Sequence, residues 1–98
     1  MPVGVLAELQ GVNPETYNSV NDEMDIDNNR PEGLIFHTAG KIESGMRIFD
    51  VWESAEDYER FERERLMPAV EKVGMGMDQT GGPPQPPEIY TLHNFMRP

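Results

Sequence analysis

Any chemistry in this chain of 98 residues depends on a small set of side chains that can exchange a proton. The sequence has no cysteine, which excludes disulfides, thiolate catalysis and thiolate metal sites. Of its 2 histidines, His37 lies between apolar neighbours in a segment expected to be a strand. As a catalytic residue, His37 would accept a proton from a phenol or an enol. The alternative is a buried or interface histidine that is hydrogen-bonded to backbone or to a carboxylate.

The other candidate site residues are aromatic or polar. A site that stabilises a phenolate or enolate needs an apolar cleft with a few polar anchors. Trp52 is the first choice for a wall of such a cleft, although a single tryptophan in a small domain is typically part of the core. The predicted substrate-binding residues are Trp52, Tyr58, Tyr17, Tyr90, Asn94 and His93, and Asp50 is a further polar candidate.

His93 and Asn94 are neighbours in the segment expected to form the last strand. Successive side chains of a strand point to opposite faces, so only one of the two is expected in the site. By the same rule His93 is grouped with Ile89, and Asn94 with Tyr90.

The charge of the chain limits its partners. A net charge of -10, from 18 acidic and 8 basic residues, repels nucleic acid and anionic membrane surfaces. The acidic run at residues 22–27 is predicted to be a solvated helix face, since it lacks the glycine and closing glutamate of a calcium-binding loop. No segment approaches the roughly 18 apolar residues that span a bilayer. We expect a cytoplasmic protein with no nucleic acid or membrane partner, no metal site and no cofactor.

The elements that would position these residues follow from hydrophobic spacing and from turn and cap signals. Strands are predicted at residues 3–9, 34–39, 46–53 and 88–96. A first helix is predicted from Pro14, with Asn13 as its N-cap, to about residues 28–29. A second helix follows Ser54, and Pro68 is expected to kink or split it near Leu66. Residues 74–87, rich in glycine, methionine and proline, are predicted to be a loop.

The order βαββαβ predicts a single domain, residues 1–98, of the α+β class with a ferredoxin-like antiparallel sheet and both helices on one face. Strand alternation places Asp50 and Trp52 on one face and Phe49 and Val51 on the other, so both faces carry apolar residues. In the preceding strand, alternation groups Leu34, Phe36 and Thr38 against Ile35, His37 and Ala39. Because the helices cover one face, a second copy of the chain is expected to cover the other in a homodimer.

The run Asp50-Val51-Trp52-Glu53-Ser54, the helix after it, the element order and the chain length together resemble the dimeric α/β-barrel superfamily, in particular its antibiotic-biosynthesis-monooxygenase-like group. The resemblance implies a dimer whose two sheets form a barrel, with a cleft between sheet and helices in each protomer. The haem-degrading relatives are disfavoured. Phe61 stands where their helical tryptophan would fall, the first strand has no asparagine, and residues 62–73 contain no histidine.

Two functions remain open at this point. The first is a small dimeric α/β-barrel protein that binds a small apolar or aromatic molecule in the cleft, without catalysis. The alternative is a cofactor-independent monooxygenase or isomerase that acts on a phenolic or polyketide-like substrate. The surroundings of His37 distinguish them, since a titratable histidine open to a cleft favours the enzyme and a histidine buried in the dimer interface favours the non-catalytic protein.

Overall fold

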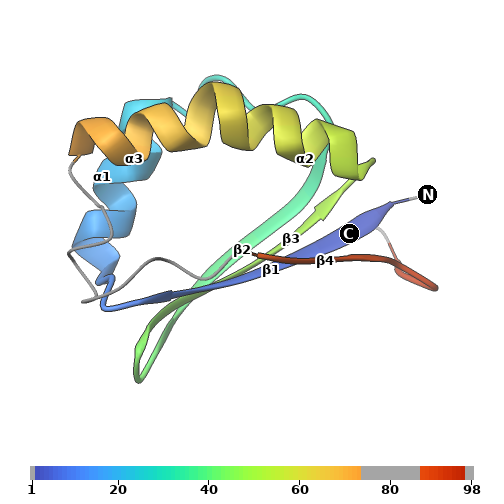
Figure 1. Cartoon of the computed structure of the whole chain (residues 1–98), viewed down its shortest axis with the longest axis horizontal. Helices are drawn as coiled ribbons and strands as arrows, with labels where there is room; N and C mark the ends of the chain where they lie inside the picture. Colours follow the sequence, from blue (N-terminus) through green and yellow to red (C-terminus); the bar gives the residue numbers. More distant parts are fainter. Residues whose placement is uncertain (1, 74–86, 97–98) are drawn as a thin grey trace.

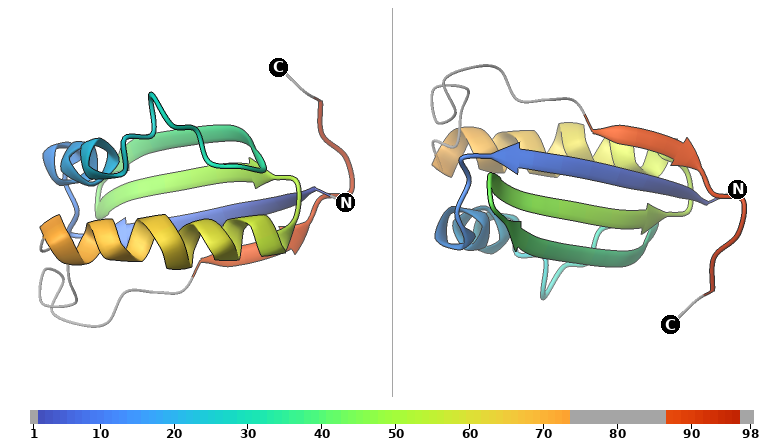
Figure 2. Two further views of the ribbon diagram at one scale, coloured as in Figure 1. Left: turned by 90° about the horizontal axis from the view of Figure 1, so that it is seen from above. Right: turned by 90° about the horizontal axis from the view of Figure 1, so that it is seen from below.

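The computed structural model describes residues 2–73 and 87–96. The strands are β1 (Val3–Gln10), β2 (Leu34–Ile42), β3 (Gly45–Trp52) and β4 (Glu88–Thr91), and they form one sheet in the order β2-β3-β1-β4. All neighbouring strands are antiparallel. The helices lie on one face of the sheet, and none of the helices in the described residues lies on the other face (Figures 1 and 2). The predicted α+β, ferredoxin-like arrangement is confirmed.

Helix α1 (Pro14–Met24) begins as predicted but ends early. The Asn13 side chain accepts a hydrogen bond of 2.8 Å from the backbone N–H of Thr16, and Pro14 occupies the first helical position. The prediction that the helix reaches residues 28–29 was wrong. Asp25 adopts the left-handed conformation, with φ 54°, and its N–H bonds to the Asp22 carbonyl. Asp and Asn tolerate this conformation better than most residues, which allows the helix to end there.

The second helical segment is continuous and contains a wide turn. It consists of α2 (Ala55–Phe61), a π-helical turn at Glu62–Leu66, and α3 (Met67–Val73). The Ser54 hydroxyl caps its start by accepting from the Asp57 N–H at 3.1 Å. In the π turn the Met67 N–H donates to the Glu62 carbonyl. Pro68 follows directly, and the wide turn relieves the clash of its ring with the preceding turn. The irregularity predicted near Leu66 is therefore present, as a π turn rather than a break.

A β-bulge near the start of β2 changes the faces predicted for that strand. Leu34 lies opposite Trp52, but after the bulge Phe36 lies opposite Val51 and His37 opposite Asp50. Residues opposite each other in an antiparallel pair share a face, so Leu34 and His37 both face the helices. The predicted grouping of Leu34 with Phe36 and Thr38 was wrong for this reason.

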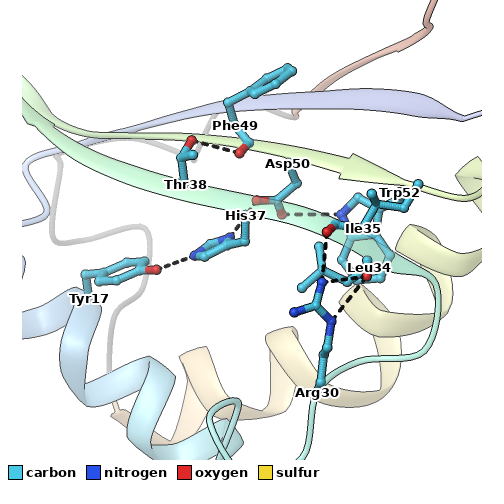
Figure 3. A network of polar contacts seen from close by, with 9 residues as sticks. All are labelled: Tyr17, Arg30, Leu34, Ile35, His37, Thr38, Phe49, Asp50 and Trp52. Carbon is cyan, nitrogen blue, oxygen red and sulfur yellow. Dashed lines mark hydrogen bonds and ion pairs between the residues drawn. The ribbon is translucent and has the colours of Figure 1, made fainter. Parts of the chain in front are cut away.

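Arg30 holds the bulged segment. Its guanidinium group donates to the carbonyl oxygen of Leu34 at 2.9 Å and to that of Ile35 at 2.9 Å (Figure 3). These carbonyls lie on the edge strand β2, where the bulge interrupts the regular pairing with β3. The guanidinium thus provides donors that a regular ladder would otherwise supply.

The core lies between the helices and the sheet. Its buried cluster consists of Val3, Val5, Trp52 and Tyr58, with Leu34, Ala55 and Phe61 packed against it. At the end of the described chain, β4 stops at Thr91, and the Leu92 N–H bonds to the Pro2 carbonyl at 3.0 Å. The strand predicted for residues 88–96 was therefore too long. The loop predicted at residues 74–87 lies almost entirely outside the described residues.

Candidate functional site

Four side chains from three elements form a continuous line of hydrogen bonds. The Tyr17 hydroxyl, from α1, lies 2.6 Å from Nε2 of His37 on β2. His37 Nδ1 lies 2.6 Å from Oδ1 of Asp50 on β3, and the Trp52 indole N–H donates to Oδ2 of Asp50 at 3.3 Å. Figure 3 shows this line, which we call the Tyr17–Trp52 relay. Its members are Tyr17, His37, Asp50 and Trp52.

The fold brings the relay together through register and alternation. Asp50 and Trp52 are two residues apart on β3, so they share a face, and the β2 bulge puts His37 opposite Asp50 on that face. Tyr17 lies on α1, which begins directly after β1 and covers the same side of the sheet (Figure 1). The relay therefore bridges the helix layer and the sheet.

The Asp50 carboxylate sets the direction of the hydrogen bonds. Its side chain is only 8% exposed, whereas that of His37 is 33% exposed. An ionised carboxylate only accepts, so the proton between the two residues lies on His37 Nδ1. His37 Nε2 is then free to accept, and the Tyr17 hydroxyl donates to it. Buried carboxylates need such donors, and Asp50 has one on each oxygen.

Tyr17 remains a neutral phenol in this setting. Burial raises the pKa of Tyr17, the negative charge of Asp50 raises it further, and a hydrogen bond with the Asn21 side chain opposes these effects only in part. The tyrosine and imidazole rings are nearly parallel, with 6° between their planes and 6.3 Å between their centroids. The hydroxyl group is thus presented to His37 as a proton donor.

Trp52 and Tyr58 were predicted as cleft walls, but both are packed into the core. Trp52 is 1% exposed and Tyr58 is 5% exposed. Their rings meet edge to face, with centroids 5.6 Å apart, and Phe61 packs against Trp52 at 5.1 Å. The Tyr58 hydroxyl donates to Glu62 at 3.2 Å, and burial raises the pKa of Tyr58. These rings fill the layer between helices and sheet instead of lining an open space.

The remaining predicted residues are not brought to the relay. Tyr90 lies opposite Gly4 on the sheet face away from the helices, and a side chain added at Gly4 would come within 3.0 Å of the tyrosine ring. His93 and Asn94 follow β4 and are exposed. Since both lie beyond the strand, the grouping predicted by alternation does not apply to them.

An apolar hollow of about 330 Å³ lies on the helix-free face of the sheet, which we call the outer face. Phe36 and Val51 lie opposite each other there, and Phe49 points away from the helices (Figure 3). The hollow is lined by Ile35, Phe36, Phe49, Val51, Phe95 and Met96. It is therefore separated from the relay by the sheet itself.

Within the described part of the chain, no group of three or more histidine, aspartate or glutamate side chains could hold a metal ion. No helix in residues 2–73 or 87–96 is long and apolar enough to cross a membrane.

No protein-family model matches this sequence, and no curated protein matches it. Solved structures do match its fold. A putative antibiotic biosynthesis monooxygenase from Chloroflexus aurantiacus superposes with a TM-score of 0.65 at 9% identity, over 98% of this chain and 97% of that one. A monooxygenase from Streptomyces coelicolor, in complex with nanaomycin D, superposes with a TM-score of 0.55 at 17% identity, over 99% of this chain and 91% of that one.

A third match is SnoaB, a cofactor-independent oxygenase from Streptomyces nogalater, with a TM-score of 0.53 at 14% identity, over 97% of this chain and 93% of that one. Identities this low establish the fold and not the activity. The described residues share the fold of these solved structures. Among the described residues, the candidate functional site on this fold is the Tyr17–Trp52 relay.

Proposed function

We propose that this protein binds a small aromatic molecule that carries a phenolic or enolic hydroxyl group, and that His37 removes the proton of that group. The observation that carries the proposal is the pair of 2.6 Å contacts that fixes both nitrogens of a histidine whose side chain is one-third exposed. A base needs a defined tautomer and contact with the solvent from which its substrate arrives, and the side chain of His37 is held by Asp50 and is one-third exposed.

The proton transfer follows from the relay. When the substrate hydroxyl replaces that of Tyr17 at His37 Nε2, the substrate O–H bond breaks, its proton moves to Nε2, and the electron pair remains on the substrate oxygen. The imidazolium ion that forms faces the Asp50 carboxylate, and a charge-assisted hydrogen bond stabilises it. An electron-rich phenolate or enolate can then reduce molecular oxygen itself, which supports oxygenase chemistry without a cofactor. One matched structure is a monooxygenase and another is a cofactor-independent oxygenase, which agrees with this proposal.

A second candidate is binding without catalysis, and one observation favours it. Both nitrogens of His37 already have partners within the chain, Tyr17 and Asp50. In this second function the relay stabilises the fold by satisfying the buried carboxylate, and the protein holds an aromatic ligand without transferring its proton.

Oxygen consumption distinguishes the two functions. With anthrone, 1-naphthol or 1,5-dihydroxynaphthalene as probes, we expect the wild-type protein to accelerate oxygen uptake on at least one of them. His37→Ala is expected to reduce that rate by about 10²-fold or more, which is the typical contribution of a general base. An oxygen electrode measures the rate, and His93→Ala, which removes the exposed histidine, is the matched control.

Equal rates for wild type and His37→Ala would overturn the role of His37 as base. Binding of a probe to the wild-type protein with no oxygen uptake would favour the non-catalytic function. Circular dichroism confirms that each variant retains the fold before rates are compared.

We further propose that the outer face forms the interface of a homodimer. This face exposes large apolar residues, including Phe36 at 39%, Tyr90 at 41% and Met96 at 89%. A contiguous apolar surface of this kind favours association with a partner. An isologous pairing of two sheets would cover both copies of the hollow at once.

Light scattering after size-exclusion chromatography tests the dimer. We expect twice the chain mass at micromolar concentration, and we expect Phe36→Glu to give a monomer because it places a charge in the apolar interface. Ala39→Glu is the matched control. It adds the same charge to the same strand, but Ala39 is exposed and lies opposite Ile48 on the helix-facing side. A wild-type monomer under these conditions would contradict the proposed interface.

A further inference from the structure

We propose that Tyr17 is an internal competitor for the substrate site: its phenol hydroxyl occupies the place on His37 Nε2 that the hydroxyl of a phenolic or enolic substrate takes. The inference rests on the proposed function and names its substrate class and the residue that controls access. The substrate is a neutral molecule with an O–H donor, and it binds only when the Tyr17 side chain moves aside.

The first step is chemical likeness. A phenol O–H lies 2.6 Å from His37 Nε2, and the Asp50 carboxylate stands behind the imidazole at 2.6 Å from Nδ1. This is the arrangement that a phenolic substrate would form with the same histidine before it loses its proton. The phenol hydroxyl of Tyr17 therefore takes the position on His37 Nε2 that the hydroxyl of a substrate would take.

The second step is the charge around this position. The buried Asp50 carboxylate lies directly behind His37, and burial and this charge both raise the pKa of Tyr17. An incoming carboxylate or phenolate would meet a nitrogen that accepts rather than donates, with a negative charge behind it. The position therefore selects neutral phenols and enols over anions, just as it keeps Tyr17 protonated.

The third step is how Tyr17 can leave. The far end of α1 is held to the second helical segment, because Arg65 donates to the Met24 carbonyl at 2.7 Å and Lys72 pairs with Glu23 at 2.7 Å. Tyr17 lies in the first half of α1, and its side chain is only partly buried. We therefore expect rotation of this one side chain and not departure of the helix.

Chemical modification tests the contact without any ligand. Diethyl pyrocarbonate acylates an accessible imidazole nitrogen, and the chain has 2 histidines, so His93 serves as an internal reference. In wild type we expect His37 to react several-fold more slowly than exposed His93. In Tyr17→Phe, which removes only the hydroxyl, we expect the His37 rate to rise toward that of His93. Peptide mass spectrometry measures both rates, and Tyr90→Phe is the matched control.

Binding of 1-naphthol tests the competition. Tyr17→Phe removes the internal hydrogen bond to His37 Nε2, so this nitrogen becomes available to the ligand. We therefore expect 1-naphthol to bind Tyr17→Phe about tenfold more tightly than wild type. 1-Methoxynaphthalene, which has no O–H donor, should bind both proteins equally. Fluorescence titration measures the affinity of each ligand for both proteins.

Three outcomes overturn the inference in distinguishable ways. An unchanged His37 modification rate in Tyr17→Phe would show that Tyr17 does not cover Nε2. Equal or weaker binding of 1-naphthol to Tyr17→Phe, with binding to wild type intact, would make Tyr17 a binding partner of the substrate instead of its competitor. Faster modification with no 1-naphthol binding to either protein would remove the proposed function, and this inference with it.

Discussion

Replacing Trp52 with alanine is expected to lower the free energy of unfolding by about 3–5 kcal/mol, because it removes the largest fully buried side chain and leaves a cavity. Val3, Val5 and Tyr58 share its cluster, and Phe61 contacts its ring, so no single neighbour can fill the space. A domain of this size typically has about 5–15 kcal/mol of stability, so the variant should be close to unfolding. Urea denaturation followed by circular dichroism measures the change, since the chain has no second tryptophan for fluorescence.

Two further variants serve as comparisons for the stability of Trp52→Ala. Trp52→Phe keeps an aromatic ring in the cluster but removes the indole N–H donor to Asp50. Trp52→Phe should lower the free energy of unfolding by less than Trp52→Ala does, by about 1–3 kcal/mol. This loss measures the effect of leaving the Asp50 carboxylate with one hydrogen-bond donor fewer. Met67→Ala, at a position 47% exposed, should change stability by less than about 0.5 kcal/mol. A cost below 1 kcal/mol for the alanine variant at Trp52 would show that this side chain does not organise the core.

Local signals in the sequence predicted the elements because each depends on neighbouring residues only. Asn13 and Ser54 cap the helices as expected, since a short polar side chain before an apolar periodic segment satisfies the free N–H groups. The end of α1 was missed because Asp25 stops the helix through its backbone conformation, and no glycine marks that stop. The extent of β4 was missed because strand-like residues continue beyond Thr91 while the pairing with β1 does not.

The relay was predicted only in its parts. Tyr17, His37 and Trp52 were candidates by residue type, but their connection depends on the bulge in β2, which arises from pairing with β3 and leaves no distinct signal in the sequence. Asp50 was considered without a role, although its separation of two residues from Trp52 places both on one face. The signal available in the sequence was the carboxylate of Asp50 two positions before Trp52 on the same strand, because this spacing predicts that the charged group and the core tryptophan share a face.

Asp50→Asn is expected to reverse the tautomer of His37 and to reduce proton transfer by about 10²–10⁴-fold. Asp50 accepts from two donors, Trp52 on one oxygen and His37 on the other. An amide has only one acceptor oxygen and would present its NH₂ group to the second donor. The Trp52 N–H cannot change its role, whereas the imidazole can. The amide oxygen should therefore turn to Trp52 and its NH₂ group to His37 Nδ1, which moves the imidazole proton to Nε2.

A histidine with its proton on Nε2 cannot accept another from a substrate there, so the base is lost while the shape of the site is kept. Nitrogen-15 NMR of the neutral imidazole reads the tautomer directly and requires no substrate: we expect the proton on Nδ1 in wild type and on Nε2 in Asp50→Asn. Glu8→Gln is the matched control, because it makes the same carboxylate-to-amide change in the exposed pair with Arg47. If the proton stays on Nδ1 in Asp50→Asn, the orientation of His37 does not depend on the carboxylate, and the buried charge must then act on the fold rather than on the base.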